Sequence, residues 1–186
     1  DVGGKGCSTL VAAHSSASHN GECGAVVCDG ASLTATSCQS VGNKADGAIA
    51  QDGASLTLMD TQCRENGRDG WFVCNAGSAL TAKASQSVGN KGDGAQAAQG
   101  ASLTLLDAQC RENGRFGWFV CNAGSALTAK ASQSVGNKED GAQAYAGATV
   151  TLVDAQCREN GRIGWFAADA GSCTVKASQS VGNKED

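Results

Sequence analysis

An internal repeat is the feature that most constrains the fold of this chain. The stretch 53–88 returns almost unchanged at 100–135 and, with more drift, at 147–181. Within this long period lies a shorter one of 23 or 24 residues, in which an apolar residue or a cysteine precedes an asparagine by ten positions. Units this short cannot bury a core alone, so we expect them to stack into a solenoid of about eight coils. The pairs that mark the units are Leu10/Asn20, Leu33/Asn43, Leu56/Asn66, Leu80/Asn90, Leu103/Asn113, Leu127/Asn137, Val150/Asn160 and Cys173/Asn183.

Each unit contains segments with the alternation of β-strands. The sequence reads Leu-Thr-Leu at 56–58 and Trp-Phe-Val at 71–73, a period-two pattern typical of half-buried strands. Glycines recur between these segments, where the chain must turn tightly. Ala79–Ser87 has the composition of a short helix, but the equivalent columns hold Ser55–Cys63 in the neighbouring unit, which has the pattern of a strand. We therefore predict an all-β fold in which each unit is one coil.

The N-x-x-x-G turn, the 23–24-residue period and the flanking alternation resemble a known fold. They are similar to the repeats of the right-handed parallel β-helix, the fold of the pectate-lyase-like superfamily. The resemblance implies an N-terminal lead-in at 1–9 and a single β-helix domain at 10–186, which is expected to belong to a longer solenoid or to be capped by a partner. It does not imply one function, because the superfamily includes lyases, hydrolases, epimerases, adhesins and binding modules.

Two amide columns are candidates for ladders along the axis. Stacked strands lie about 4.8 Å apart, so an asparagine at the same place in each coil can satisfy the amides above and below it. A glutamine column stands four residues earlier and allows two interpretations, a second buried ladder or an outward, solvated row. The predicted asparagine ladder contains Asn43, Asn66, Asn90, Asn113, Asn137 and Asn160, and the glutamines are Gln39, Gln62, Gln86, Gln109, Gln133, Gln156 and Gln179.

The aromatic residues occupy two adjacent columns. Tryptophan alternates with alanine five positions after the asparagines, which is how a narrow core fills its volume, so we expect the tryptophans inside. The next column holds Phe72, Phe119 and Phe166 with glutamines between them. Two interpretations are open: either this face is outward and the phenylalanines form a contact row, or they belong to the core.

The ten cysteines do not predict a disulfide framework. Members of one column lie two coils apart, beyond the roughly 4.4–6.8 Å between Cα atoms that a disulfide allows. We expect most to be free, with Cys63 and its equivalents pointing inward as small apolar groups. The exception is the N-terminus, where Cys7 could pair with Cys28 or with Cys23. The spacing of a zinc site is absent, and no metal or cofactor is expected.

Charge and motif content exclude several functions. The net charge of −4 argues against a nucleic-acid partner, and no apolar run reaches the length of about 20 residues that membrane insertion needs. Asp60 and its equivalents recur in alternate coils, so we expect them to pair with lysines such as Lys83 of the intervening coils. His14 and His19 stand in the irregular first unit without an acidic cluster. Nothing here resembles a catalytic motif.

These observations favour a non-catalytic structural or interaction module. We expect a rigid solenoid that docks a protein partner or enters a larger assembly, with end-to-end self-association as a further possibility, because the end strands of a solenoid have unpaired edges. The alternative is a protein that binds or cleaves a polysaccharide along the rod. Near-perfect repeats favour the scaffold, since enzymes of the superfamily break the repeat at the active cleft.

Overall fold

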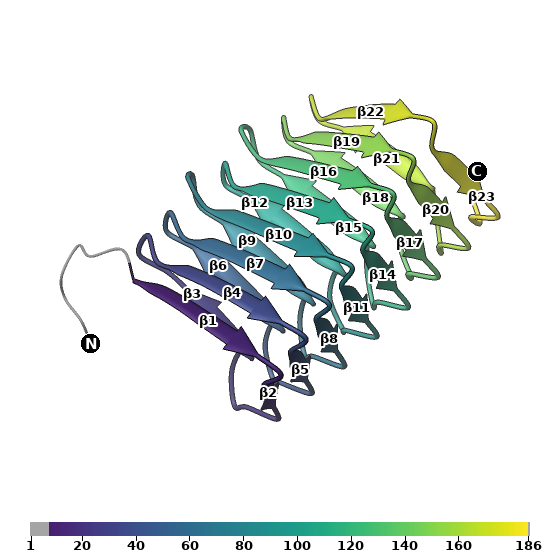
Figure 1. Ribbon diagram of the computed structural model, residues 1–186. Helices are drawn as coiled ribbons and strands as arrows, with labels where there is room; N and C mark the ends of the chain where they lie inside the picture. Colours follow the sequence, from purple (N-terminus) through teal and green to yellow (C-terminus); the bar gives the residue numbers. More distant parts are fainter. Residues whose placement is uncertain (1–7, 186) are drawn as a thin grey trace.

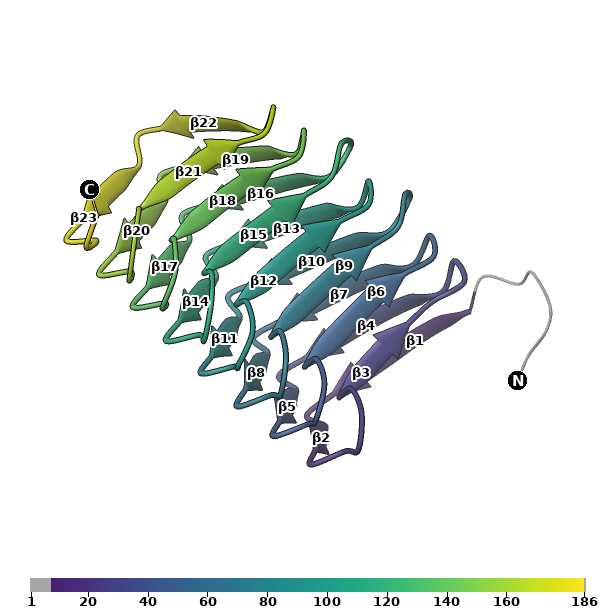
Figure 2. The same cartoon turned by 180° about the vertical axis from the view of Figure 1, so that it is seen from behind.

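The computed structural model describes residues 8–185, which form an elongated stack of coils (Figure 1). Three parallel sheets run along the stack, and successive coils supply neighbouring strands (Figure 2). The first sheet contains β1 (Thr9–Ala13), β4 (Ser32–Thr36), β7 (Ser55–Met59), β10 (Ala79–Lys83), β13 (Ser102–Leu106), β16 (Ala126–Lys130), β19 (Thr149–Val153) and β22 (Ser172–Lys176). The second contains β2 (Ser16–Ser18), β5 (Gln39–Val41), β8 (Gln62–Arg64), β11 (Gln86–Val88), β14 (Gln109–Arg111), β17 (Gln133–Val135), β20 (Gln156–Arg158) and β23 (Gln179–Val181). The third contains β3 (Ala25–Val27), β6 (Ala48–Gln51), β9 (Trp71–Cys74), β12 (Ala95–Ala98), β15 (Trp118–Cys121), β18 (Ala142–Tyr145) and β21 (Trp165–Ala168).

The predicted parallel β-solenoid of about eight coils is confirmed. We number the coils 1 to 8 from the N-terminal end; coils 1 to 7 each contain one strand of every sheet, and coil 8 consists of β22 and β23. The segment with helix-favouring composition, Ala79–Ser87, lies in β10 and β11, as the strand pattern of its columns predicts. Strands account for all the regular structure of residues 8–185, which include no helix able to cross a membrane.

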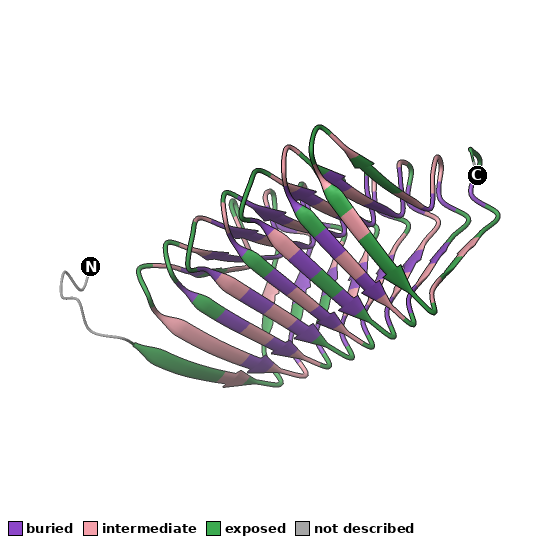
Figure 3. Cartoon of the chain, turned by 90° about the horizontal axis from the view of Figure 1, so that it is seen from above, coloured by how far each residue is buried: buried purple, intermediate pink, exposed green. Residues whose placement is uncertain are grey.

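The strands are stacked in register, so each sequence column becomes a row along the axis. Leu80 pairs with Leu56 on one side and with Leu103 on the other, and the next residue, Thr81, pairs with threonines on both sides. Because strand side chains alternate between faces, the leucines fill the interior and the threonines face outward. Bands of equal burial therefore run across successive strands (Figure 3).

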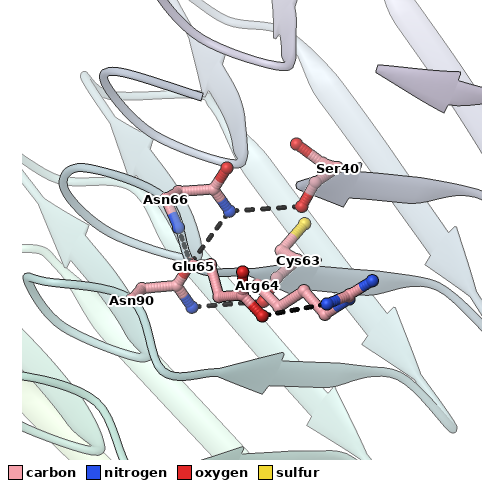
Figure 4. Close-up of polar contacts among 6 residues, drawn as sticks. All are labelled: Ser40, Cys63, Arg64, Glu65, Asn66 and Asn90. Carbon is pink, nitrogen blue, oxygen red and sulfur yellow. Dashed lines mark hydrogen bonds and ion pairs between the residues drawn. The ribbon is translucent and has the colours of Figure 1, made fainter. Parts of the chain in front are cut away.

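The asparagine ladder lies at the corner after the second sheet. Asn90 donates from Nδ2 to Oδ1 of Asn113 at 3.0 Å, and its backbone N–H donates to the same oxygen at 3.1 Å. Its Nδ2 also donates to the carbonyl oxygen of Cys63 in the preceding coil at 3.1 Å. Asn66 makes the same contacts, to Asn90 and to the Ser40 carbonyl (Figure 4). Each buried amide is thus satisfied by its neighbours, which confirms the ladder.

All the predicted ladder residues take part. The pattern begins with Asn20, which donates to Asn43, and continues to Asn183, which accepts from Asn160. The ladder residues named from the sequence are at most 1% exposed: Asn43, Asn66, Asn90, Asn113, Asn137 and Asn160.

A close backbone approach explains the glycine four residues after each asparagine. A Cβ on Gly94 would lie 2.6 Å from the Cβ of Cys110 and 2.6 Å from the carbonyl oxygen of Gly117 in the next coil. No real Cβ tolerates such contacts, so any larger residue would push the coils apart. Glycine is therefore required here by packing, and it lets the ladder form at this corner.

Coils with large inward side chains alternate with coils whose inward side chains are small. The strand pairing places Trp71 between Ala48 and Ala95, and Trp118 between Ala95 and Ala142. Both tryptophans are fully buried, as predicted. Two further inward columns alternate in the same phase: Leu58, Ala82, Leu105, Ala129 and Leu152, and Cys63, Ser87, Cys110, Ser134 and Cys157. A coil with large side chains thus always packs against coils that leave room for them.

Replacing one central rung tests the ladder. In Asn113→Ala, the backbone N–H and one amide N–H of Asn90 lose their acceptor inside the protein. Each buried donor left without a partner costs about 1–3 kcal/mol, so the free energy of unfolding should fall by about 2–5 kcal/mol. Urea unfolding followed by circular dichroism measures this loss.

The matched control is Gln109→Ala in the same coil. Gln109 lies on the outward face of β14 and is half-exposed, so we expect a loss below about 1 kcal/mol. Equal losses in the two variants would contradict the role given to the asparagine.

Candidate functional site

The predicted phenylalanine row lies on the outward face of the third sheet, on β9, β15 and β21. Phe72 and Phe119 are half-buried and Phe166 is 36% exposed, whereas the preceding tryptophans point into the core. Pairing places Gln96 between Phe72 and Phe119, and Gln143 between Phe119 and Phe166. Of the two interpretations left open by the sequence, the outward one is therefore correct. The role of the row in binding remains a prediction.

A second aromatic residue extends the row at one point. Phe116, in the turn before β15, stacks on Phe119 with ring centroids 5.0 Å apart and an interplanar angle of 20°. The Arg115 guanidinium lies 5.1 Å from the Phe116 ring centroid and 5.9 Å from that of Phe119. Cations over ring faces are attracted by the ring quadrupole, so Arg115 is held against the pair. The result is an aromatic platform with a positive charge packed over its rings.

An open hollow of about 370 Å³ lies beside this platform. Arg68, Lys91 and Arg115 supply three positive charges to it, Gln96 of the phenylalanine row lines it, and Asp69 supplies a carboxylate. The hollow joins polar groups from coils 3, 4 and 5 to the aromatic face.

A column of buried aspartates stands behind these arginines, and the sequence analysis missed it. Asp46, Asp69 and Asp93 occupy the third position after the ladder asparagine in three successive coils, and each is at most 5% exposed. The Oδ1 atom of each accepts the backbone N–H of the same position in the next coil, at 2.7–3.2 Å. Asp140 repeats the arrangement by accepting the N–H of Ile163.

Arginines from the neighbouring coil approach the outer carboxylate oxygens. Arg68 Nη1 lies 3.4 Å from Oδ2 of Asp46, and Arg115 Nη1 lies 3.7 Å from Oδ2 of Asp93. These oxygens accept no hydrogen bond, and the arginine side chains are more than half exposed. The ion pairs are therefore long and partly solvated, and they compensate the buried charge incompletely.

Burial raises the pKa of these carboxyl groups. The pKa of Asp93 rises to about 7, chiefly through burial and then through the negative charge of Asp69, while Arg115 opposes the shift. Burial likewise raises the pKa of Asp69 to about 6. Burial also raises the pKa of Asp140. Carboxyl groups that titrate near neutrality are a signal of functional sites, but structural networks produce them as well.

Two other expectations are tested by the structure. The glutamine column lies on the outward face, where Gln62 is exposed and Gln86 half-exposed, so the interpretation as a buried ladder is wrong and the solvated row is correct. The expected pairing of Asp60 with Lys83 is also wrong, because every ion pair of the described residues joins an arginine to an acid. Lys83 stands in register with Met59, and Asp60 meets Lys83 through the backbone, where its N–H donates to the Lys83 carbonyl at 3.1 Å.

The cysteines follow the sequence prediction in part. Cys63 and Cys110 are inward and buried, and burial raises the pKa of Cys63 to about 12, so this thiol stays protonated. Cys7 lies outside the described residues, so its pairing with Cys28 stays a prediction. Residues 8–185 contain no group of three metal-ligating side chains. His14 and His19 are exposed in coil 1.

Comparison with known proteins identifies the class of this chain. The family described as the right-handed beta helix region matches residues 2–110, more than half of the sequence. The chain therefore belongs to this family of right-handed β-helix proteins. A comparison with curated proteins finds no significant match. Family membership establishes the fold and leaves the activity to be argued from the surface.

The buried aspartates predict an unusual pH dependence of stability. The pKa of Asp93 is higher in the folded chain (about 7) than in an unfolded one (about 4), so the folded state binds more protons between these values. The stability contributed by the protonated carboxyl is complete below about pH 4 and is lost as the pH rises through about 7. Asp93→Asn should therefore raise the free energy of unfolding at pH 8 by about 1–3 kcal/mol and flatten its dependence on pH.

Urea unfolding of wild type and variant from pH 4 to pH 8 measures this effect. Asp107→Asn is the control, since Asp107 is exposed and should leave both stability and slope unchanged. A less stable Asp93→Asn protein at pH 8, with an unaltered slope, would show that the carboxylate is well compensated in the fold.

Proposed function

We propose that this chain is a non-catalytic, rigid β-solenoid that docks a protein partner on the outward face of its third sheet. The observation that carries the proposal is the row of Phe72, Phe119 and Phe166, which places an aromatic side chain outside at every second coil. Aromatic residues that face outward and are flanked by polar groups mark contact surfaces. We name this surface, with Gln96 and Gln143, the aromatic face.

Rigidity supports the choice of a docking surface. The strands that carry the row are hydrogen-bonded to neighbours on both sides, except for β21 at its edge of the described sheet. The phenylalanines are therefore fixed about 9.6 Å apart, two strand spacings along the axis. Side chains that are already ordered lose little entropy on binding, which favours association with a partner of matching shape.

The charged surroundings suit a protein partner. Arg115 packs over Phe116 and Phe119, and the hollow beside them adds Arg68 and Lys91. Interfaces commonly combine aromatic and arginine anchors with a polar rim, and acidic side chains of a partner would be steered toward these cations. The net charge of −4 makes this local positive group a distinctive feature of the surface.

A carbohydrate-binding role is the second candidate. Along the axis, Gln96 and Gln143 alternate with the phenylalanines, so that rings for stacking and amides for hydroxyl groups lie in one line. A polysaccharide laid along the rod would meet both. The near-identical units argue for binding rather than cleavage, since enzymes of this fold break the repeat at the active cleft.

The proposal includes association of two copies of the chain through the ends of their stacks. Leu10 and Val11 of β1 are 63% and 71% exposed, and Val175 of β22 is 37% exposed, at the two ends of the described stack. Apolar strands with an unpaired edge can pair with a second copy.

A triple variant, Phe72, Phe119 and Phe166→Ser, tests the aromatic face. The immobilised wild-type chain is used to capture partners from native extract, and the captured protein is then purified and titrated against both chains. We expect the triple variant to weaken binding of that protein at least tenfold, because three aromatic anchors are lost.

The matched control is Thr57, Thr104 and Thr151→Ser, which alters the outward face of the first sheet in the same three coils. It should bind as wild type does. Binding of a glycan that depends on the phenylalanines would favour the second candidate instead. Equal binding of a partner by wild type and triple variant would place the contact surface elsewhere.

A further inference from the structure

The hollow beside the aromatic platform lies at a glycine within a column of charged residues. The second position after the ladder asparagine holds, in coils 3 to 7, Arg68, Gly92, Arg115, Glu139 and Arg162. Backbone hydrogen bonds keep this column in register: the Gly92 N–H donates to the Arg68 carbonyl at 2.8 Å, and the Arg115 N–H donates to the Gly92 carbonyl at 3.0 Å. An acid therefore stands between the second pair of arginines, whereas no side chain stands between the first pair.

Coil 6 shows what an acid does at this position. Arg162 Nη1 lies 3.5 Å from Oε2 of Glu139, and Arg162 Nε lies 3.9 Å from Oδ1 of the buried Asp140. The same Nε lies 3.6 Å from Oε2 of Glu185 in coil 8. An arginine of this column can therefore bind a partly exposed carboxylate while it also faces the buried aspartate behind it.

Arg115 has the buried acid but lacks the exposed one. Asp93 follows Gly92 in the sequence as Asp140 follows Glu139, and Arg115 Nη1 lies 3.7 Å from Oδ2 of Asp93. Within residues 8–185, Asp93 is the only acid that forms an ion pair with Arg115. The guanidinium is more than half exposed. The place of the Glu139 carboxylate is therefore open to solvent in coil 4.

Two further cations and one acid line the same hollow. Lys91, which precedes Gly92, is exposed, and so is Arg68. Asp69 is only 5% exposed, and its Oδ1 accepts the N–H of Asp93 at 2.7 Å, so this carboxyl serves the backbone. Burial raises the pKa of Asp69 to about 6 and that of Asp93 to about 7, so at pH 6 both are partly or largely protonated. The positive groups of the hollow then outnumber its negative ones.

We propose that this hollow binds the carboxylate of an acidic side chain, a glutamate or an aspartate of the protein that docks on the aromatic face. The carboxylate takes the place at Gly92 that the Glu139 carboxylate takes in coil 6, and it is held by Arg115 and Lys91. Hydrogen bonds between such cations and a carboxylate are about twice as strong as those between neutral groups. This inference rests on the proposed docking function, because it names the chemistry of the partner. Arg115 belongs to both surfaces, since it also packs over the aromatic platform.

Titration of the whole chain with a blocked tripeptide tests the site without the partner. The probe is acetyl-Gly-Glu-Gly-amide, and the peptide with glutamine in place of glutamate is its uncharged counterpart of the same shape. At pH 6 and low ionic strength the probe is ionised and its charge is weakly screened. Amide resonances of Lys91, Gly92 and Gln96 in ¹H–¹⁵N spectra report binding. We expect saturable shifts with the glutamate peptide and at least tenfold weaker binding of the glutamine peptide.

Two variants with matched controls locate the probe. Lys91→Gln removes a cation from the hollow, and Gln96→Glu adds a competing carboxylate to its wall. The controls are Lys138→Gln, which removes the lysine of the same column in coil 6, and Gln133→Glu, which adds the same charge on the outward face of the second sheet. Each variant of the hollow should bind the glutamate peptide at least threefold more weakly, and each control should bind it as wild type does.

Several results would overturn this assignment. Without saturable shifts at Gly92 the hollow holds no carboxylate, and with equal affinity for the two peptides it does not recognise charge. Unchanged binding in both hollow variants would place the probe elsewhere. Tighter binding of D-glucuronate than of the glutamate peptide would assign the hollow to an acidic sugar.

Failure of this inference can be told from failure of the docking proposal. The tripeptide is titrated into the purified chain, whereas docking is measured by the dependence of partner binding on the three phenylalanines. A partner that needs the phenylalanines, together with a hollow that binds no carboxylate, would contradict this inference alone.

Discussion

In-register stacking along the axis governs every other feature of this protein. Each residue contacts the residue of the same column in the coils above and below. A column is therefore stable only if the side chains of neighbouring coils can pack or hydrogen-bond against each other. Asparagine does so ideally, because its amide both donates and accepts, as between Asn90 and Asn113. Tryptophan tolerates only a small neighbour, which explains the alternation of Trp71 with Ala95.

Aspartate can also stack in register, but burial of its charge lowers the stability of the fold. The carboxylates of Asp69 and Asp93 each accept a backbone N–H from the next coil, which keeps the turn in register. Burial raises their pKa values, and the negative charges of neighbouring coils add to the rise. The arginines outside the column reduce this cost and, through Arg115, connect the buried carboxylates to the aromatic face.

The repeat allowed the fold, the asparagine ladder and the inward tryptophans to be predicted, because a fixed period assigns each residue to a column. Whether a column faces inward or outward could be predicted only where it contained both apolar and polar residues. Glutamine in the column of Phe72 indicated an outward face, whereas the column of Gln62 contains only glutamine from coil 2 onward and left both directions open. The aspartates were missed because turns lack the alternation of strands. The signal was present: Phe116 and Ile163 share their column, which indicates burial.

Hydrogen exchange in the native state tests the dependence of the fold on the ladder most directly. The backbone N–H groups of Asn66, Asn90 and Asn113 donate to side-chain oxygens of the next coil and not to strand carbonyls. If the ladder holds the coils together, these amides exchange only through global unfolding, with the same free energy as amides at the centre of β13. If these asparagine amides exchanged at the rate of exposed turns while the strands stayed protected, the fold would not depend on the ladder.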